Sequence, residues 1–201
     1  MIIHRMPQRS DEWYAVRLGK ITGTQFQTMA NGRKDTIDTL CYKIAAERLT
    51  GQPCEKAYTN SAMENGVALE PLARAAYETT AFAAVDEVGF LELDEFVGCS
   101  PDGLVGDDGG VEIKCPEAHT HLKNLGDSSC WKAYKWQLQG ALWVTDRKWW
   151  DFVSFCPLFP PGQQLVVCRV KPDAKAFSAL DAGSEYCRNA IVGILDGVSH
   201  G

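Results

Sequence analysis

The sequence has no apolar run near the roughly 18 residues that a membrane-spanning helix requires. Its N-terminal segment, Met1 to Ser10, carries charges where a signal peptide has an apolar stretch. It also has no internal repeat, low-complexity tract or Gly/Ser-rich linker. We therefore expect the 201 residues to form one domain, 1–201, that is neither inserted in a membrane nor exported.

Closely spaced cysteine pairs are also missing. The chain has eight cysteines, but no two of them show the C-x-x-C spacing that is usual for zinc ligands. Most lie in apolar runs such as Val166-Val167-Cys168. This pattern is typical of reduced thiols in the core of a cytosolic protein, so we expect a cytoplasmic location.

Positive charge is in short supply. There are 20 Lys and Arg against 26 Asp and Glu, which gives a formal net charge of -6. A protein that simply coats nucleic acid usually has a basic surplus, so the charge balance argues against that class. An enzyme that acts on nucleic acid remains compatible with it, because a metal site needs carboxylates and the bound cations reverse its local sign.

The periodicity of the apolar residues predicts an α/β domain with a mixed sheet. A capping-box pattern at Ser61 and Glu64 predicts a helix that runs on to Tyr77, and Pro71 predicts a kink or break in it near Glu70. The other expected helices span 36–50, 128–144 and a long stretch after Asp173. The expected strands span 85–93, 96–99, 111–115, 149–155 and 164–170.

Two short segments, 99–104 (CSPDGL) and 111–116 (VEIKCP), carry the most informative side chains. Asp102 follows an expected strand and precedes a glycine turn. Glu112 and Lys114 lie two apart on the next strand, so their side chains point to the same face. A hairpin between these strands would bring Asp102, Glu112 and Lys114 together.

Two carboxylates and a lysine suit phosphodiester hydrolysis. Asp102 and Glu112 would hold a hard divalent cation, which prefers oxygen ligands and lowers the pKa of a bound water. Lys114 would orient that water or stabilise charge in the transition state. The main-chain carbonyl of Ile113 is a further candidate ligand. Each segment alone is most often structural, a common turn and a common half-exposed strand, but together they match the nuclease signature PD-(D/E)-x-K.

Further segments occur in a fixed order along the chain: 13–24 (WYAVRLGKITGT), 63–78 (MENGVALEPLARAAYE), 99–104 (CSPDGL), 110–116 (GVEIKCP) and 134–145 (YKWQLQGALWVT). In these segments the chain resembles the lambda-exonuclease family, also called the YqaJ-type viral recombinases. Beyond residue 150 the resemblance lies mainly in the pattern of strands and a final helix.

The resemblance implies a restriction-endonuclease-like PD-(D/E)xK core, with a five-stranded mixed sheet flanked by helices, in a single nuclease domain. It implies a Mg²⁺-dependent 5′→3′ exonuclease of the alkaline-exonuclease type, with Mn²⁺ as a substitute and two ions per site. Such an enzyme degrades double-stranded DNA from its ends to 5′ mononucleotides, and the 3′ overhang that remains serves recombination by strand annealing. The implied assembly is a homotrimeric ring around the DNA, with a single-strand annealing protein as partner. Phage or prophage origin in a bacterial host is implied as well.

The resemblance also assigns roles to single residues. Glu70, Asp102, Glu112 and Lys114 resemble the catalytic set. Asp102, Glu112 and the Ile113 carbonyl resemble the metal ligands, which Glu70 joins directly or through water. Taken alone, Glu70 would be interpreted as a solvated helix carboxylate.

Arg17, Thr24, Ser100 and Gln137 resemble a pocket for the 5′-terminal phosphate. Arginine grips phosphate through two parallel hydrogen bonds, and the other side chains supply neutral donors.

Trp13, Met63 and Tyr134 are expected to contact DNA, with Met63 wedged between bases near the duplex end; core packing is the alternative for Trp13 and Met63. Tryptophans 131, 136, 143, 149 and 150 are expected in the core or at a subunit interface, and His119 and His121 in a loop or helix. The basic residues expected to face the duplex in the ring are Lys20, Arg33, Lys34, Lys132 and Lys135.

Other functions use similar residues. A PD-(D/E)xK endonuclease or a RecB-type nuclease would have the same site, and circular duplex DNA separates these from an exonuclease, which needs an end. A non-catalytic module that binds DNA ends is expected to lack one of Glu70, Asp102, Glu112 or Lys114, and this chain has all four.

Overall fold

The computed structural model describes residues 1–55 and 61–199, except for the side chains of 61–63 and 199. Its helices are α1 (Asp11–Arg17), α2 (Phe26–Asn31), α3 (Lys34–Thr50), α4 (Ser61–Ala81), α5 (Ala118–Leu125), α6 (Lys135–Thr145) and α7 (Ala174–Ser199), with 3-10 turns η1 (Gly23–Gln25) and η2 (Cys130–Tyr134). Its strands are β1 (Ile2–His4), β2 (Val85–Asp86), β3 (Phe90–Glu92), β4 (Gly98–Cys99), β5 (Gly103–Val105), β6 (Gly109–Lys114), β7 (Trp149–Phe155) and β8 (Leu165–Val170). None of the described helices is both long and apolar enough to cross a membrane.

The central feature is a five-stranded sheet in the order β2-β5-β6-β7-β8. Strands β6 and β7 are parallel and the other neighbours are antiparallel, so the predicted mixed sheet is confirmed. Alternate residues of β7 serve the two faces, as strand geometry requires: Trp150 and Phe152 join the larger core cluster and Val153 and Phe155 the smaller.

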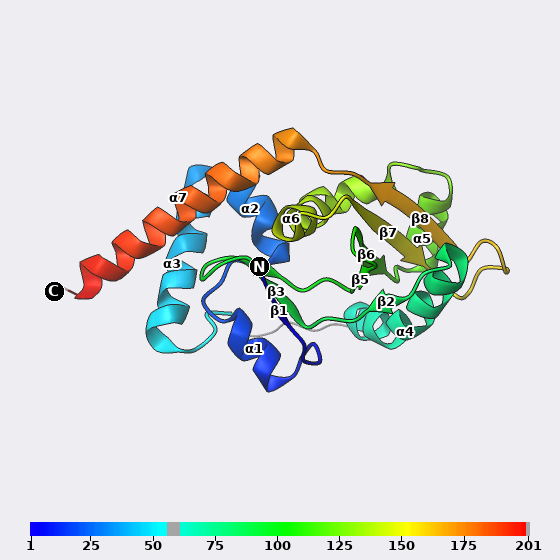
Figure 1. Ribbon diagram of the computed structural model, residues 1–201, viewed down its shortest axis with the longest axis horizontal. Coiled ribbons are helices and arrows are strands. Elements are labelled where there is room, and N and C mark those ends of the chain that lie inside the picture. The colour runs from blue at the N-terminus through cyan, green and yellow to red at the C-terminus, as the bar shows by residue number, and fades with distance from the viewer. Residues whose placement is uncertain (56–60, 200–201) are drawn as a thin grey trace.

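Helices cover both faces of this sheet (Figure 1). Helix α4 packs on the face of Val153, where its Tyr77 is fully buried. Helix α6 covers the opposite face, and α2, α3 and the long α7 pack behind it. Glu112 and Lys114 alternate with Val111 and Ile113 along β6 and therefore face the α6 side.

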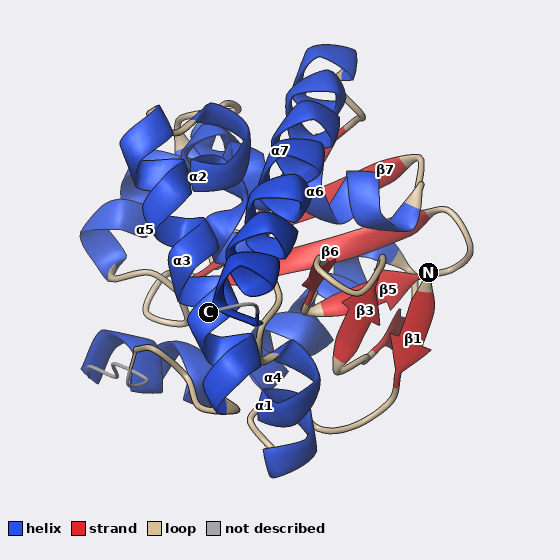
Figure 2. Cartoon of the chain, turned by 90° about the vertical axis from the view of Figure 1, so that its left-hand side faces the viewer, coloured by secondary structure: helices blue, strands red, loops and turns tan. Residues whose placement is uncertain are grey.

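A second, three-stranded sheet in the order β1-β3-β4 was not expected from the sequence. Figure 2 shows β1 and β3 side by side near the N-terminus. The predicted strand 85–93 is divided between the two sheets, since β2 belongs to the large sheet and β3 to the small one. The predicted strand 96–99 forms β4 of the small sheet, and the unpredicted β5 takes the place beside β6.

The helix predictions were right in kind and partly wrong in extent. Of the kink or break expected near Glu70, the break is absent, because α4 continues through Pro71 to Ala81. Pro71 and Val67 are both exposed, so water can reach the Val67 carbonyl that loses the proline N–H. The expected helix over 128–144 begins as η2 and becomes α-helical at Lys135. Helices α1, α2 and α5 were missed.

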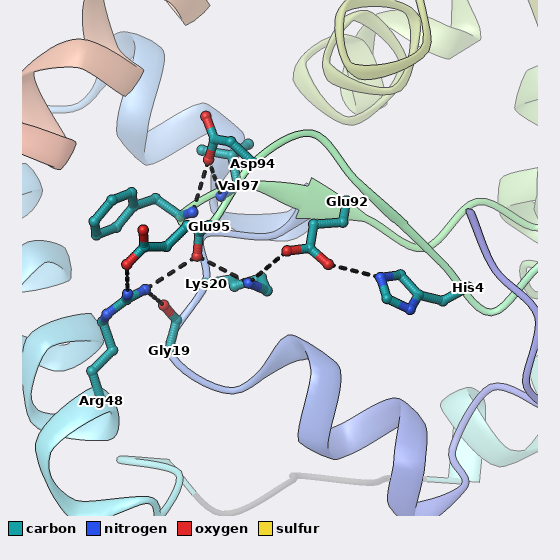
Figure 3. A network of polar contacts seen from close by, with 9 residues as sticks. His4, Gly19, Lys20, Arg48, Glu92, Asp94, Glu95 and Val97 are labelled. Carbon is teal, nitrogen blue, oxygen red and sulfur yellow. Dashed lines mark hydrogen bonds and ion pairs between the residues drawn. The ribbon is translucent and has the colours of Figure 1, made fainter. Parts of the chain in front are cut away.

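A polar network fastens the N-terminal segment to the small sheet (Figure 3). Glu92 pairs with His4 at 2.7 Å and accepts a hydrogen bond from Lys20 Nζ at 3.2 Å. Lys20 also donates to the main-chain carbonyl of Glu95, as does Arg48, which forms an ion pair with the Glu95 carboxylate. The Lys20 side chain is only 14% exposed. It therefore stabilises the fold and is not part of an exposed basic surface such as the one expected to face DNA.

The contact between α6 and α2 gives a test of the packing. A Cβ at Gly140 would lie 1.9 Å from the ring of buried Phe26. We expect Gly140→Ala to lower the free energy of unfolding by about 1–3 kcal/mol, because overpacking outweighs the helix propensity gained. The matched control is Gly193→Ala in α7, where a Cβ meets nothing within 4 Å; it should be stabilised by about 0.5–1 kcal/mol. Urea unfolding measures both, and equal stability of the two variants would contradict this packing.

Candidate active site

The β5–β6 hairpin brings Asp102, Glu112 and Lys114 together. Gly103 pairs with Val111 in the hairpin, which places the preceding Asp102 beside β6. Asp102 Oδ2 accepts a hydrogen bond of 2.6 Å from the Ile113 N–H, and Lys114 Nζ lies 2.5 Å from Glu112 Oε1. The proximity expected from the sequence spacing is therefore present.

Residues from η2 and α6 complete this side of the site. Gln137 Nε2 donates to Glu112 Oε1 at 2.5 Å. The Tyr134 ring stacks on Phe152 and lies 5.3 Å from Lys114 Nζ. Gln137 was expected in a phosphate pocket, but its observed partner is Glu112.

Helix α4 supplies Glu70. Arg74, one turn further along α4, donates to Glu70 Oε1 at 2.7 Å. Glu70 and Asp102 border two cavities. One, of about 900 Å³, also contains Lys114 and Tyr134. The other, of about 540 Å³, contains Arg74.

Burial and crowding disturb the ionisation of these groups. Burial raises the pKa of Asp102 to about 7, and Glu112 adds to the rise, while Lys114 opposes it. Burial also raises the pKa of Glu70, with a contribution from Asp102. For Lys114, burial lowers the pKa but Glu112 and Asp102 outweigh it, so the net shift is upward and the lysine is charged.

The donor set suits a hard cation. Asp102, Glu112, Glu70 and the Ile113 carbonyl offer oxygen ligands only, as Mg²⁺ prefers. Within residues 1–55 and 61–199, no three His, Cys, Asp or Glu side chains form a compact metal cluster. A cation held here would therefore need the carbonyl or water besides the carboxylates. His119 and His121 lie on α5, and His121 bonds Ser154 and the Gln163 carbonyl.

A second cluster lies at the start of the segment that leads to Asp102. Arg17 Nη1 donates to Ser100 Oγ at 2.8 Å, and Trp13 Nε1 donates to the same oxygen at 2.9 Å. The Arg17 guanidinium lies 4.0 Å from the centre of the Trp13 ring. Burial lowers the pKa of Arg17 to about 10, so it remains charged at neutral pH.

The remaining predicted pocket residue, Thr24, is exposed on η1. The threonine that contacts Arg17 is buried Thr22, whose Oγ1 accepts from Arg17 Nη2 at 3.3 Å. Sequence reasoning missed Thr22, although both threonines belong to the same ITGT motif. The Met63 side chain lies outside the described residues.

The tryptophans, the cysteines and the basic residues expected to face DNA differ in how far they match the predictions. Trp150 is fully buried and the other four tryptophans of that group are half-buried, in keeping with core or interface positions. All eight cysteines are free of disulfides; Cys41, Cys99, Cys156 and Cys187 are buried as predicted, whereas Cys54 is exposed. Ion pairs with neighbouring aspartates engage Arg33, Lys34 and Lys135.

A mixed sheet that presents an aspartate at the start of a hairpin and a Glu-x-Lys strand defines the class of PD-(D/E)xK nucleases. Residues 12–148 match the model of the YqaJ-like viral recombinase domain, and the chain belongs to this alkaline exonuclease-like family. Among curated proteins, no sequence matches the chain.

Solved structures agree with the family. The exonuclease LHK-Exo in complex with dAMP is 30% identical with a TM-score of 0.84, covering 95% of this chain and 97% of that one. The alkaline exonuclease LHK-Exo from Laribacter hongkongensis is 31% identical with a TM-score of 0.80, covering 95% and 99%. A phage related exonuclease from Haemophilus somnus 129PT has the same fold at 14% identity, with a TM-score of 0.72 and coverages of 89% and 96%.

The raised pKa of Asp102 has a consequence for stability. Its ionisation opposes folding, so the penalty is absent below about pH 4, grows with pH and is complete above about pH 7. In metal-free buffer we expect Asp102→Asn to be more stable than the native protein, by about 1–3 kcal/mol at pH 8 and by little at pH 4. The control is Asp107→Asn, in the exposed β5–β6 turn, whose stability difference should not follow this profile. Unfolding measured across this pH range would contradict the argument if the Asp102→Asn difference were constant.

Proposed function

We propose that the protein is a Mg²⁺-dependent 5′→3′ exonuclease on double-stranded DNA, which releases 5′ mononucleotides and leaves a 3′ overhang. The observation that carries the proposal is the juxtaposition of two sites on one short segment. Ser100 belongs to the cluster of Arg17 and Trp13, and Asp102 belongs to the cluster of Glu112 and Lys114.

In the proposed mechanism, Asp102, Glu112 and the Ile113 carbonyl hold the metal, and Glu70 contributes directly or through water. A bound Mg²⁺ supplies Lewis-acid chemistry and a water of lowered pKa. Glu112 is held in place by Lys114 and Gln137. Lys114, charged and close to the carboxylates, orients the attacking water or stabilises negative charge on the phosphate. We propose two ions per site, with Mn²⁺ able to substitute.

The cluster around Arg17 supports the proposed 5′→3′ direction of degradation. Its guanidinium has neutral partners, Ser100 and Thr22, in the described part of the chain, so its charge is available to an anion. Ser100 and Asp102 are two residues apart, at most about 7 Å between Cα atoms. A 5′-terminal phosphate bound by Arg17 would therefore leave the adjoining phosphodiester within reach of Asp102.

We further propose that the protein forms a homotrimeric ring that encloses the duplex. Light scattering would measure the mass of this assembly in solution. A single-strand annealing protein would use the 3′ overhang. The site of action would be the cytoplasm of a bacterial host, and the origin a phage or prophage. The resemblance to the family supports these proposals. Tyr134, beside Lys114, and Lys132, which is exposed, are the described residues on η2 best placed to meet DNA.

The catalytic assignment predicts a specific pattern of loss. Asp102→Asn and Glu112→Gln should each lower the rate of duplex degradation by at least about 100-fold while the fold persists, because the cation loses a ligand. Lys114→Ala should be similarly inactive yet still bind Mg²⁺. The control Lys148→Gln removes a charge at the opposite end of the sheet and should retain activity. Release of nucleotides from linear duplex and from an intact circle is the measurement. A native rate on the circle equal to that on the linear duplex would refute the exonuclease assignment, and an active Asp102→Asn would refute the catalytic role of Asp102.

The polarity proposal predicts a preference for 5′-phosphorylated ends. A charge-assisted arginine contact is worth roughly 1.5–3 kcal/mol, so 5′-hydroxyl ends should be degraded about 10- to 150-fold more slowly. Arg17→Ala should remove most of this preference, whereas Arg17→Lys should keep part of it because the charge remains. Initial rates on matched duplexes test this, and equal native rates on both ends would rule out the pocket.

A further inference from the structure

The cavity of about 540 Å³ is bordered by Glu70 and Asp102, which the mechanism above uses, and by basic side chains, which it does not use. Three arginines line it: Arg5, Arg9 and Arg74. Arg9 also borders the larger cavity, next to Lys114. Its side chain therefore stands where the two cavities adjoin, at the edge of the candidate active site.

The main chain holds Arg9 firmly. Its φ of +69° is in the left-handed region, which residues other than glycine adopt rarely. The preceding Gln8 donates from Nε2 to the Pro101 carbonyl at 2.8 Å. The following Ser10 caps α1 by accepting from the Trp13 N–H at 3.2 Å. Arg9 is thus fixed between a contact to the residue before Asp102 and the helix that carries Trp13.

The arginines of this cavity differ in their partners. Arg5 makes two hydrogen bonds of 2.8 Å to Asp86. Arg74 forms ion pairs with Glu70 at 2.7 Å and Glu87 at 2.6 Å. No residue in the described ranges forms a hydrogen bond or ion pair with the Arg9 side chain, which is exposed.

Arg9 is close to the site in electrostatic terms. Burial raises the pKa of Glu70, and Arg74 and Arg9 act against that rise. Arg74 adds a buried Nε that has no hydrogen-bond partner among the described residues. A buried donor without a partner is unusual in a folded protein and indicates a place for an acceptor.

We propose that this cavity binds a nucleotide phosphate, with Arg9 as its principal contact. The inference rests on the proposed function and names a contact distinct from the Arg17 cluster. Guanidinium groups match phosphate oxygens in geometry and charge. Three carboxylates also line this cavity. Glu70 and Glu87 are both paired with Arg74, and Asp102 belongs to the proposed metal site, where a bound cation would offset its charge. The phosphate belongs either to the DNA backbone next to the cleaved bond or to the released mononucleotide.

The experiment compares Arg9→Gln, Arg9→Lys and Arg9→Gly with the control Lys148→Gln. Glycine adopts a positive φ without strain, so Arg9→Gly removes the guanidinium without endangering the fold. Binding of a 5′-phosphorylated linear duplex is measured in EDTA, where no cleavage occurs, over a series of salt concentrations. Inhibition of cleavage by dAMP is measured with Mg²⁺.

For a backbone phosphate, Arg9→Gln and Arg9→Gly should weaken duplex binding about tenfold. The slope of log affinity against log salt should become shallower by about 0.9, while Arg9→Lys and Lys148→Gln keep the native slope. For a released mononucleotide, the slope stays native and the inhibition by dAMP weakens by a similar factor instead. Either result supports the cavity as a phosphate site and identifies the source.

Native values of both the salt slope and the dAMP inhibition in Arg9→Gln and Arg9→Gly would overturn the inference, even with the native protein fully active. Failure of the proposed function is a different observation, in which the native protein itself neither binds nor degrades the duplex; the inference then falls with it.

Discussion

The hydrogen bond from the Ile113 N–H to the Asp102 carboxylate joins the segment before β5 to strand β6, and the candidate site depends on it. It fixes the Asp102 carboxylate beside β6, where the two neighbours of Ile113, Glu112 and Lys114, face the α6 layer. The bond also helps the protein to keep the Asp102 carboxylate in a buried position, because an N–H donor favours the charged form of a carboxyl. Glu70 reaches the same place from α4, so the site is assembled where helix and hairpin meet.

Crowding carboxylates in such a place costs stability, and the surrounding residues offset the cost. Lys114 and Gln137 bind Glu112, and Arg74 binds Glu70. Asp102 has the Ile113 N–H but no ion pair in the described part of the chain, which agrees with its being the carboxyl with the most strongly raised pKa. A divalent cation would remove this repulsion. The same feature that weakens the metal-free fold therefore favours cation binding.

The sequence predicted the parts of the molecule that rest on local pattern. Strands β6, β7 and β8 and helices α3 and α7 have apolar periodicity over six or more residues, and the pair Glu112 and Lys114 needs only strand geometry. Strands β1 and β5 are three residues long, so no period can identify them, and the predicted strands 85–93 and 96–99 contain β3 and β4 without showing that these belong to a second sheet. The contact of Thr22 with Arg17 could not be predicted because it depends on where the Arg17 side chain lies. The lack of a partner for Arg9 among the described residues, like the bond of Gln137 to Glu112, depends on long-range packing.

The N-terminal segment has a role that neither the Arg17 cluster nor the Asp102 cluster shows by itself. Within three residues, Ser100 meets Arg17 and Trp13, the Pro101 carbonyl accepts from Gln8, and Asp102 bonds Ile113. Residues 8–17 and strand β6 thus hold the same short segment from two sides, and the network of Lys20, Glu92 and Arg48 anchors the chain just beyond α1. The proposed recognition of a DNA end, with hydrolysis next to it, would require a fixed spacing between the proposed anion pocket and the proposed metal ligands. In this chain the spacing would be set by the two peptide units from Ser100 to Asp102, whose three residues are each bonded to the rest of the fold.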